Sequence, residues 1–552
     1  MRQKTVNALL PILLLAFGMD SVAAAQGRAV SGGTTMRQHT AGRIQAARAV
    51  AEGEAALARG EEAAARAAFR RALASEPNHL AAHTHLGVLI DRAGDLEEAE
   101  RHFAAAARLA PRLASARNNY GAILLRQGRR VEAAIEFEAS LKLDPSQSNA
   151  LINLAQIRFA GGGAEGLRAA RELFGRAHAL APDPEVARAL VVIALRLGEK
   201  ERATTAYRDY AAQLVGPLAA SVSAPASRAE LGAALLEAGL IEEARTELGA
   251  AVAGDPSGVD AVIALARAHL RKRDVPAAGR VLEAAVARGL DVAPIYAALA
   301  DVYEAGGYVE NAIPAMRLAL QRAPRNETYH FRYGLLLTDS KAPAAAIIRL
   351  QESLAQFPRS ARLRLALGIA QLTHGKNDDA TASFSRAIEL DPKLVPALAY
   401  LGAAHVERGE YAQAIAFYER AVVADEGQAA PYYLAADAML KQSIFDAAKA
   451  EKYLERAVVL DPTLAPARLA LAKLYVRAER WAEAALHLAE AVRLDPELAE
   501  AHYQLGRVYV RLKRPAEAQA ALATFKRLSD TQKERREGER RELVRRLADV
   551  RF

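Results

Sequence analysis

Four histidines near the start of the chain are the side chains best suited by type to bind a metal ion. They are His79, His83, His85 and His102. His79 and His83 lie four residues apart, so on a helix they could present two ring nitrogens on one face. No carboxylate stands with them at ligand spacing, and His83 takes a repeat position that faces a neighbouring helix. We therefore expect histidines that pack or lie exposed, and no metal site.

Signatures of catalysis or cofactor binding are weak or absent. Gly161, Gly163 and Gly166 formally match G-x-G-x-x-G. A dinucleotide site needs a strand before that motif, whereas the pattern here predicts a helix, so we interpret the stretch as an elongated turn. The sequence has no nucleophile-elbow, zincin, Walker or EF-hand motif and no cysteine. We expect neither enzymatic activity nor a cofactor.

Asparagines have a spacing that indicates binding rather than catalysis. Asn119 and Asn153 lie 34 residues apart, with Asn118 and Asn149 close in sequence. An amide offers both a donor and an acceptor, so it can bond the main chain of an extended peptide whatever the peptide's side chains. Asparagine adds little to helix stability, which favours a binding role. The alternative is a solvated helix face that happens to use asparagine.

A repeating pattern of small, aromatic and proline residues must position these side chains. It is clearest in Arg364–Pro392, where two helical stripes flank the turn-like segment HGKNDD. Gly368 and Ala380 allow two helices to approach closely, and Phe384 fills the space between them. Pro392 ends the second helix because proline cannot continue it.

The same pattern returns about every 34 residues, and we count 14 repeats. The first small position holds Gly53, Gly87, Gly121, Ala155, Val191, Gly232, Ala266, Ala300, Gly334, Gly368, Gly402, Ala436, Ala472 and Gly506. The second small position holds Ala65, Ala99, Ala133, Ala170, Ala203, Ala244, Ala278, Ala312, Ala346, Ala380, Ala414, Ala450, Ala484 and Ala518.

This pattern resembles the tetratricopeptide repeat (TPR). The resemblance implies an all-α fold, a right-handed superhelical α-solenoid of about 14 helix-turn-helix repeats with an inner groove. It also implies a non-enzymatic scaffold that binds peptides or proteins in this groove, without naming the biological role. An asparagine ladder holds partner backbone in some long TPR superhelices, such as that of the O-GlcNAc transferase family. Only Asn119 and Asn153 match that ladder here, and no Lys–Asn pair of the carboxylate-clamp type is in phase.

The phase of the repeats selects the candidate groove residues. Most of them lie two positions before the first small residue, on the stripe expected to face the groove. The candidate partner-binding residues are His85, Asn118, Asn119, Asn149, Asn153, Arg332 and Tyr400.

Changes in composition divide the chain into segments. We expect a signal peptide at 1–25, a flexible tether at 26–42 and a first TPR block at 43–215. A seam rich in Pro, Ser and Ala at 216–227 precedes a second block at 228–528, and altered curvature or a hinge at the seam is our hypothesis. A charged capping helix at 529–552 would cover the end of the array.

The first residues predict export. Arg2 and Lys4 precede a short apolar run that ends in three alanines, which is typical of a signal peptide cleaved near Ala25. We expect a periplasmic location in a bacterial envelope and no transmembrane span in the mature chain, an uncleaved anchor being the alternative. The net charge of +8 is spread over 73 basic and 65 acidic residues, which does not indicate nucleic-acid binding.

Two functions are consistent with these features. The favoured one is the exported scaffold with protein or peptide partners. The alternative is a non-catalytic subunit of an envelope complex for glycan export, secretion or group transfer.

Overall fold

The computed structural model describes residues 35–214 and 224–531, and every regular element in these ranges is an α-helix. The 28 helices there form fourteen consecutive pairs, each joined by a short turn. The predicted all-α array of about 14 helix-turn-helix repeats is confirmed for the described residues.

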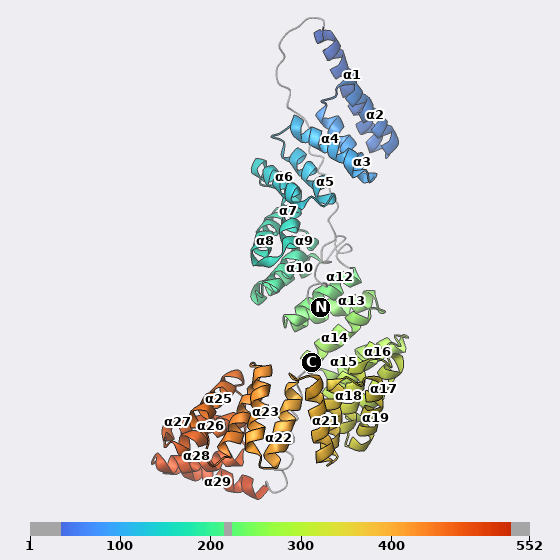
Figure 1. The fold of residues 1–552 in the computed structure, drawn as a ribbon. Helices are drawn as coiled ribbons and strands as arrows, with labels where there is room; N and C mark the ends of the chain where they lie inside the picture. The colour runs from blue at the N-terminus through green and yellow to red at the C-terminus, as the bar shows by residue number, and fades with distance from the viewer. Residues whose placement is uncertain (1–34, 215–223, 532–552) are drawn as a thin grey trace. The chain divides into compact units, whose positions relative to one another are not determined.

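The chain divides into two compact units, Met1–Leu290 and Asp291–Phe552, and Figure 1 labels their helices. The first unit contains α1 (Thr35–Ala58), α2 (Glu62–Ser75), α3 (Leu80–Arg92), α4 (Leu96–Leu109), α5 (Ala114–Arg126), α6 (Arg130–Leu143), α7 (Ser148–Gly161), α8 (Gly163–Leu180), α9 (Pro184–Arg196), α10 (Lys200–Gln213), α12 (Pro225–Glu237), α13 (Ile241–Gly254), α14 (Val259–Arg271) and α15 (Val275–Ala287).

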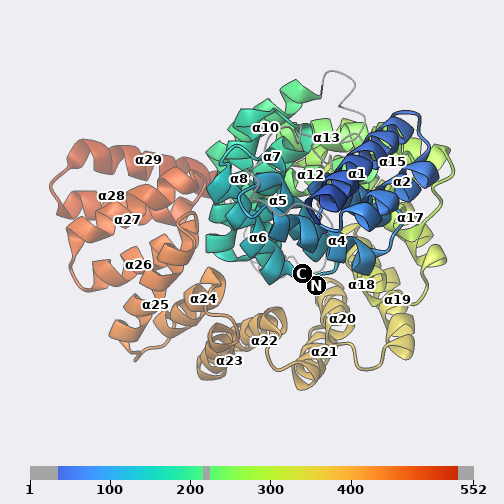
Figure 2. The ribbon, with the colours of Figure 1, turned by 90° about the horizontal axis from the view of Figure 1, so that it is seen from above.

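The second unit contains α16 (Ala293–Ala305), α17 (Val309–Arg322), α18 (Glu327–Asp339), α19 (Pro343–Gln356), α20 (Ala361–Thr373), α21 (Asn377–Leu390), α22 (Val395–Glu407), α23 (Tyr411–Ala424), α24 (Ala429–Leu440), α25 (Ala447–Leu460), α26 (Ala465–Arg477), α27 (Trp481–Leu494), α28 (Ala499–Arg511) and α29 (Pro515–Thr531). Its pairs follow one another along an arc, with the first helices α18, α20, α22 and α24 on the inner side (Figure 2).

In twelve of the fourteen described pairs, a large residue on the second helix follows the first small position by sixteen residues, and in the other two pairs Phe174 and Leu454 follow it by 19 and 18. A Cβ built on Gly87 would lie 3.0 Å from the Phe103 ring, and one built on Gly121 would lie 2.9 Å from the Phe137 ring. These distances are shorter than ordinary van der Waals contacts, so a side chain at either position would force the ring to shift.

The burial of the second small position confirms the repeat register. All fourteen alanines of that series are between 0 and 3% exposed. Each of them lies where the second helix crosses its neighbours, so a larger side chain would force the helices apart.

The predicted seam does not separate the two units. One hydrophobic core extends across it from Ala155 to Ala268, and the boundary between the units lies at 290/291. Residues 225–227 already belong to α12, because proline at the first helical position needs no backbone donor. Residues 216–223 lie outside the described residues, and the hinge stays a hypothesis.

Two other boundaries differ from expectation. Residues 35–42 of the predicted tether belong to α1, since no proline interrupts them and Gly42 lets the helix pass the Ser75 carbonyl. The insertion in the fourth repeat does not form an elongated turn: only Gly162 separates α7 from α8. The extra residues lengthen α8, where Leu167 is buried and anchors the added turn.

The predicted signal peptide and residues 532–552 of the predicted capping helix lie outside the described residues, so both stay predictions. Within the described ranges, none of the helices has the length and hydropathy that a bilayer span requires.

Replacing Gly368 with Ala should lower the free energy of unfolding by about 1–3 kcal/mol, because the added methyl group overlaps the Phe384 ring. Adding Phe384→Leu should recover part of the loss, since Ala266 and Leu282 already combine at this separation. Urea denaturation followed by circular dichroism measures both effects.

Gly175→Ala is the matched control for this experiment. Gly175 lies within α8 and has no atom within 4 Å of its Cβ position, so alanine there should be neutral or stabilising. Equal stability of Gly368→Ala and the unaltered protein would show that the assigned register is wrong.

Candidate partner-binding surface

The predicted asparagine cluster is largely covered by neighbouring helices. Asn118, Asn119 and Asn153 are 5%, 8% and 8% exposed. The Asn118 amide donates to Asn119 Oδ1 at 3.4 Å, and Asn118 Oδ1 is buried without a hydrogen-bond partner. Asn149, near the start of α7, is half-buried and is the most accessible of the four. The structure thus pairs Asn118 with Asn119, and it covers three of the four amides instead of presenting them as an exposed ladder.

His85 and Tyr400 occupy the same repeat position and pack on the preceding repeat. The His85 ring stacks on Phe69 at 5.0 Å between centroids, and the Tyr400 ring stacks on Phe384 at 4.8 Å. Burial lowers the pKa of His85, and Glu54, 3.3 Å away, opposes that shift. Tyr400 is 5% exposed. In both cases the two stacked rings lie sixteen residues apart in the sequence. This spacing could have predicted the contact, but the phase of the first helices alone does not show it.

Arg332 is a bridge between two first helices of the second unit. Its guanidinium forms an ion pair with Asp301 on α16 and lies 3.9 Å from Glu304 on the same helix. The side chain is 23% exposed, so it reaches the surface while its charge is already compensated. Arg332 can contact a partner, but its first structural role is to hold α18 against α16.

Two of the four histidines, His83 and His102, bond each other, and His83 and His79 also bond backbone groups. His83 Nδ1 and His102 Nδ1 lie 2.9 Å apart, and His83 Nε2 lies 2.8 Å from the Pro77 carbonyl oxygen. His79 Nδ1 accepts from the Ala82 amide at the start of α3. In the described part of the chain, no group of three or more His, Asp or Glu side chains is placed to hold a metal ion.

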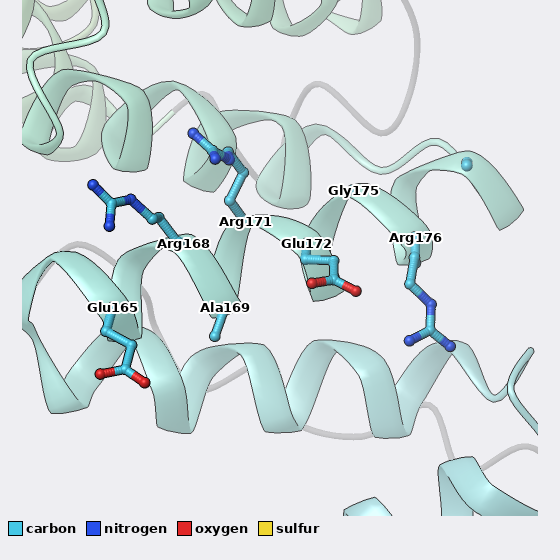
Figure 3. A pocket seen from close by; sticks show the side chains of 8 residues that line it. Glu165, Arg168, Ala169, Arg171, Glu172, Gly175 and Arg176 are labelled. Carbon is cyan, nitrogen blue, oxygen red and sulfur yellow. The ribbon is translucent and has the colours of Figure 1, made fainter.

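Two hollows on the surface of the described residues contain none of the candidate residues. The larger, about 770 Å³, is lined by α8 alone: Glu165, Arg168, Ala169, Arg171, Glu172, Gly175, Arg176 and Ala179. Arg168 and Arg171 point to one side of this helix and Glu165 and Arg176 to the other (Figure 3). Arg171 already pairs with Glu199. A hollow bounded by one helix cannot enclose a small ligand.

The smaller hollow, about 440 Å³, lies among α19, α20 and α21. Two of its polar side chains satisfy each other, since Ser383 Oγ donates to Gln371 Oε1 at 2.6 Å. This bond is structural, and Gln351, Arg364 and Asp379 are the other polar side chains that line the hollow.

A buried polar cluster joins α9, α10, α12 and α13, on both sides of residues 215–223 in the sequence. Tyr207 donates to Glu247 Oε1 at 2.9 Å, and Glu247 is 0% exposed. Arg228 lies 3.8 Å from the other Glu247 oxygen. Burial raises the pKa of Glu247, while the Tyr207 hydrogen bond and Arg228 oppose the shift. Arg188, 1% exposed, pairs with Glu185 nearby.

One row of side chains in the second unit stays exposed in every repeat. It comprises the residues five positions after the first small position, in or just after the last turn of each first helix, and we call it the exposed row. Its members are Ala305, Asp339, Thr373, Glu407, Lys441, Arg477 and Arg511. The row is acidic at Asp339 and Glu407 and basic from Lys441 onward. The row lies seven positions after the candidate groove position, so helical phase at that position does not predict it.

His102→Asn should weaken the acid sensitivity of the fold. Burial, followed by the nearby His83, lowers the pKa of His102 to about 4. Between this value and the ordinary histidine pKa of about 6.5, the unfolded chain binds a proton that the folded chain does not. Stability therefore falls as the pH drops from 6.5 towards 4, and His102→Asn should reduce the fall.

Urea midpoints at pH 7.5 and pH 5 measure this difference. His374→Asn, at an exposed site, is the matched control for loss of an imidazole. An identical pH dependence in all three proteins would contradict the assignment.

Tyr207→Phe should destabilise the first unit by about 1–3 kcal/mol, because Glu247 loses its donor while it stays buried. Tyr207→Phe with Glu247→Leu should be less damaging than Tyr207→Phe alone, since no unpaired carboxylate remains. Tyr308→Phe, where the ring is 60% exposed, is the control for loss of a hydroxyl. Urea unfolding that shows equal stability for Tyr207→Phe and the control would refute a structural role for this bond.

Comparison with known proteins places this geometry in a family. Tetratricopeptide repeat models match residues 50–114, 91–148, 229–294, 335–395 and 365–431, residues 476–527, and residues 293–326. Together these matches cover more than half of the chain. No curated protein matches the sequence.

Several solved structures are similar in fold. One is the APC/C hetero-tetramer Cut9–Hcn1, with 14% identity over 86% of this chain and 99% of that chain and a TM-score of 0.37. Another is a tetratricopeptide repeat protein from Parabacteroides merdae, with 20% identity over 46% and 98% and a TM-score of 0.37. A third is YrrB, described as a TPR protein with an unusual peptide-binding site, with 19% identity over 36% and 98% and a TM-score of 0.29.

The family matches recur in step with the helix pairs that the structure shows. The chain belongs to the tetratricopeptide repeat family, whose members typically act as scaffolds for protein interaction.

Proposed function

We propose that the protein is a non-enzymatic scaffold that binds an extended segment of a partner along the first helices of its second unit. The observation that carries this proposal is the exposed row, which offers one accessible side chain per repeat on adjacent first helices. Adjacent helices pack about 8–10 Å apart, so the row has the regular spacing that an extended chain can follow.

The change of charge along the row supports a directed mode of binding. Acidic residues occupy its start and basic residues its end, so a partner segment of complementary charge would bind in one orientation. The buried amides Asn118, Asn119 and Asn153 contribute less to this proposal than the sequence analysis expected. Asn149 and Arg332 remain accessible enough to contact a partner.

The N-terminal sequence supports export of this scaffold to the bacterial envelope. We propose that the chain is cleaved near Ala25 and acts in the periplasm. Sequencing of the N-terminus of the protein purified from its native cells tests this: a start at or near Gln26 is expected, and a retained Met1 would refute cleavage.

Site-specific photo-crosslinking in native cells tests the binding proposal. A photoreactive amino acid at Thr373 or Glu407, both on the exposed row, should capture a partner protein. The same amino acid at Val423 or Leu486 on second helices, 79% and 69% exposed, should capture much less. Equal capture at all four positions would refute a binding surface on the first helices.

The captured partner decides between the scaffold and its alternative. A glycosyltransferase, porin or secretion protein would identify the chain as a non-catalytic subunit of an envelope complex. A soluble client without such a complex would favour an independent scaffold.

A further inference from the structure

Three arginines near the end of the second unit carry charges that no carboxylate among the described residues compensates. Arg477, at the end of α26, and Arg507 and Arg511 on α28 are exposed. None of the three forms an ion pair within the described ranges. Their guanidinium groups instead lie over aromatic rings: Arg477 is 5.5 Å from the Phe445 centroid, Arg507 is 5.7 Å from Tyr503, and Arg511 is 5.8 Å from Trp481.

Neighbouring arginines show that the repeats can neutralise this charge. Arg480 also lies over an aromatic ring, 4.0 Å from the centroid of Tyr475. Unlike the three arginines above, it pairs with Glu451 at 2.6 Å and with Glu483. Arg514 pairs with Glu517. Arg477, Arg507 and Arg511 have no such carboxylate partner in the described ranges, and we call these three residues the arginine surface.

The three arginines form one surface by their register. Arg507 and Arg511 lie four residues apart on α28 and so share a face of the helix. Arg477 and Arg511 occupy the same position of successive repeats and stack on rings that are also equivalent, Phe445 and Trp481. Contact between an arginine and an aromatic ring restricts the guanidinium. Arg477 is held further, because both of its terminal nitrogens donate to the Leu440 carbonyl oxygen at 3.4 Å.

We infer that the arginine surface binds an acidic, extended peptide segment of a partner protein. This inference rests on the proposed scaffold function and adds the chemistry of the partner. A guanidinium recognises a carboxylate through two parallel hydrogen bonds. The repeat spacing of about 8–10 Å equals about three residues of extended chain at about 3.3–3.6 Å each, so acidic residues should recur at every third position.

Charge complementarity points to another protein and not to the ends of this chain. Residues 532–552 contain 8 basic and 5 acidic residues, and residues 1–34 contain 3 basic residues and 1 acidic residue. Both segments are net positive, so neither complements the arginine surface.

Titration with synthetic peptides on the mature full-length protein tests the inference. The first probe is a twelve-residue peptide with glutamate at every third position, and the second has glutamine in place of each glutamate. A third peptide has the composition of the first with its glutamates adjacent. Trp481 is the single tryptophan of the chain, so its fluorescence reports directly on the surface.

The spaced acidic peptide should change the Trp481 emission and bind at least about tenfold more tightly than the glutamine peptide. It should also bind more tightly than the peptide with adjacent glutamates, and its affinity should fall as salt is added. Equal affinity for the acidic and glutamine peptides would overturn the inference.

Two double variants separate local recognition from net charge. Arg477→Gln with Arg511→Gln should weaken the spaced acidic peptide at least about tenfold. Arg325→Gln with Arg359→Gln removes the same charge at exposed sites in the same unit and should weaken binding less than twofold. If both double variants lose the same affinity for the peptide, the peptide is attracted only by the net charge of the protein, and the arginine surface is not a specific site.

A third variant and a vesicle assay complete the test. Arg477→Lys with Arg511→Lys keeps the charge but removes the paired donors, and it should bind the peptide several-fold more weakly. Stronger binding to vesicles containing phosphatidylglycerol than to the peptide would assign the surface to lipid and overturn the inference. If crosslinking at Thr373 or Glu407 captures a partner but the acidic peptide does not bind, only the inference of an acidic partner is refuted. If neither crosslinking nor peptide binding is observed, the proposed scaffold function is refuted as well.

Discussion

Most helix pairs depend on the contact between a glycine or other small residue and the large side chain sixteen positions later. The contact lets two helices approach until the ring or branched chain fills the space above the small residue, as Phe103 does at Gly87 and Phe137 at Gly121. A single pair cannot bury its remaining apolar surface, so every pair must stack on the next. Stacking brings His85 onto Phe69 and Tyr400 onto Phe384, and it leaves the exposed row as the accessible part of the first helices.

The repeat architecture could be predicted from the sequence because it depends on local, periodic information. The spacing of Gly368, Ala380 and Phe384 defines a helix pair, and recurrence of that spacing defines the array. The candidate binding residues were harder to predict. Helical phase shows which residues share a face, but a first helix in an array has neighbours on several sides. Phase alone therefore could not show that Asn119 and Asn153 are covered while Arg511 is exposed.

The segment between α10 and α12 shows a second limit of sequence analysis. Prolines and small residues indicate an interruption of the helical pattern, and they do not indicate what packs on either side. The Tyr207–Glu247 hydrogen bond joins residues forty positions apart, and one hydrophobic core surrounds it. Only the assembled helices show that the chain is tied together there and that the boundary between compact units lies later.

The position of both contact partners inside one repeat has an evolutionary consequence. Since the small residue and the large residue that covers it are encoded within about half a repeat, duplication or loss of a whole repeat copies or removes a matched pair. Such an event leaves the remaining pairs intact, whereas a point mutation at Gly87 or Phe103 disrupts one. The number of repeats is therefore freer to change by recombination than the identity of either contact residue, and the length of the binding surface can evolve apart from the packing that supports it.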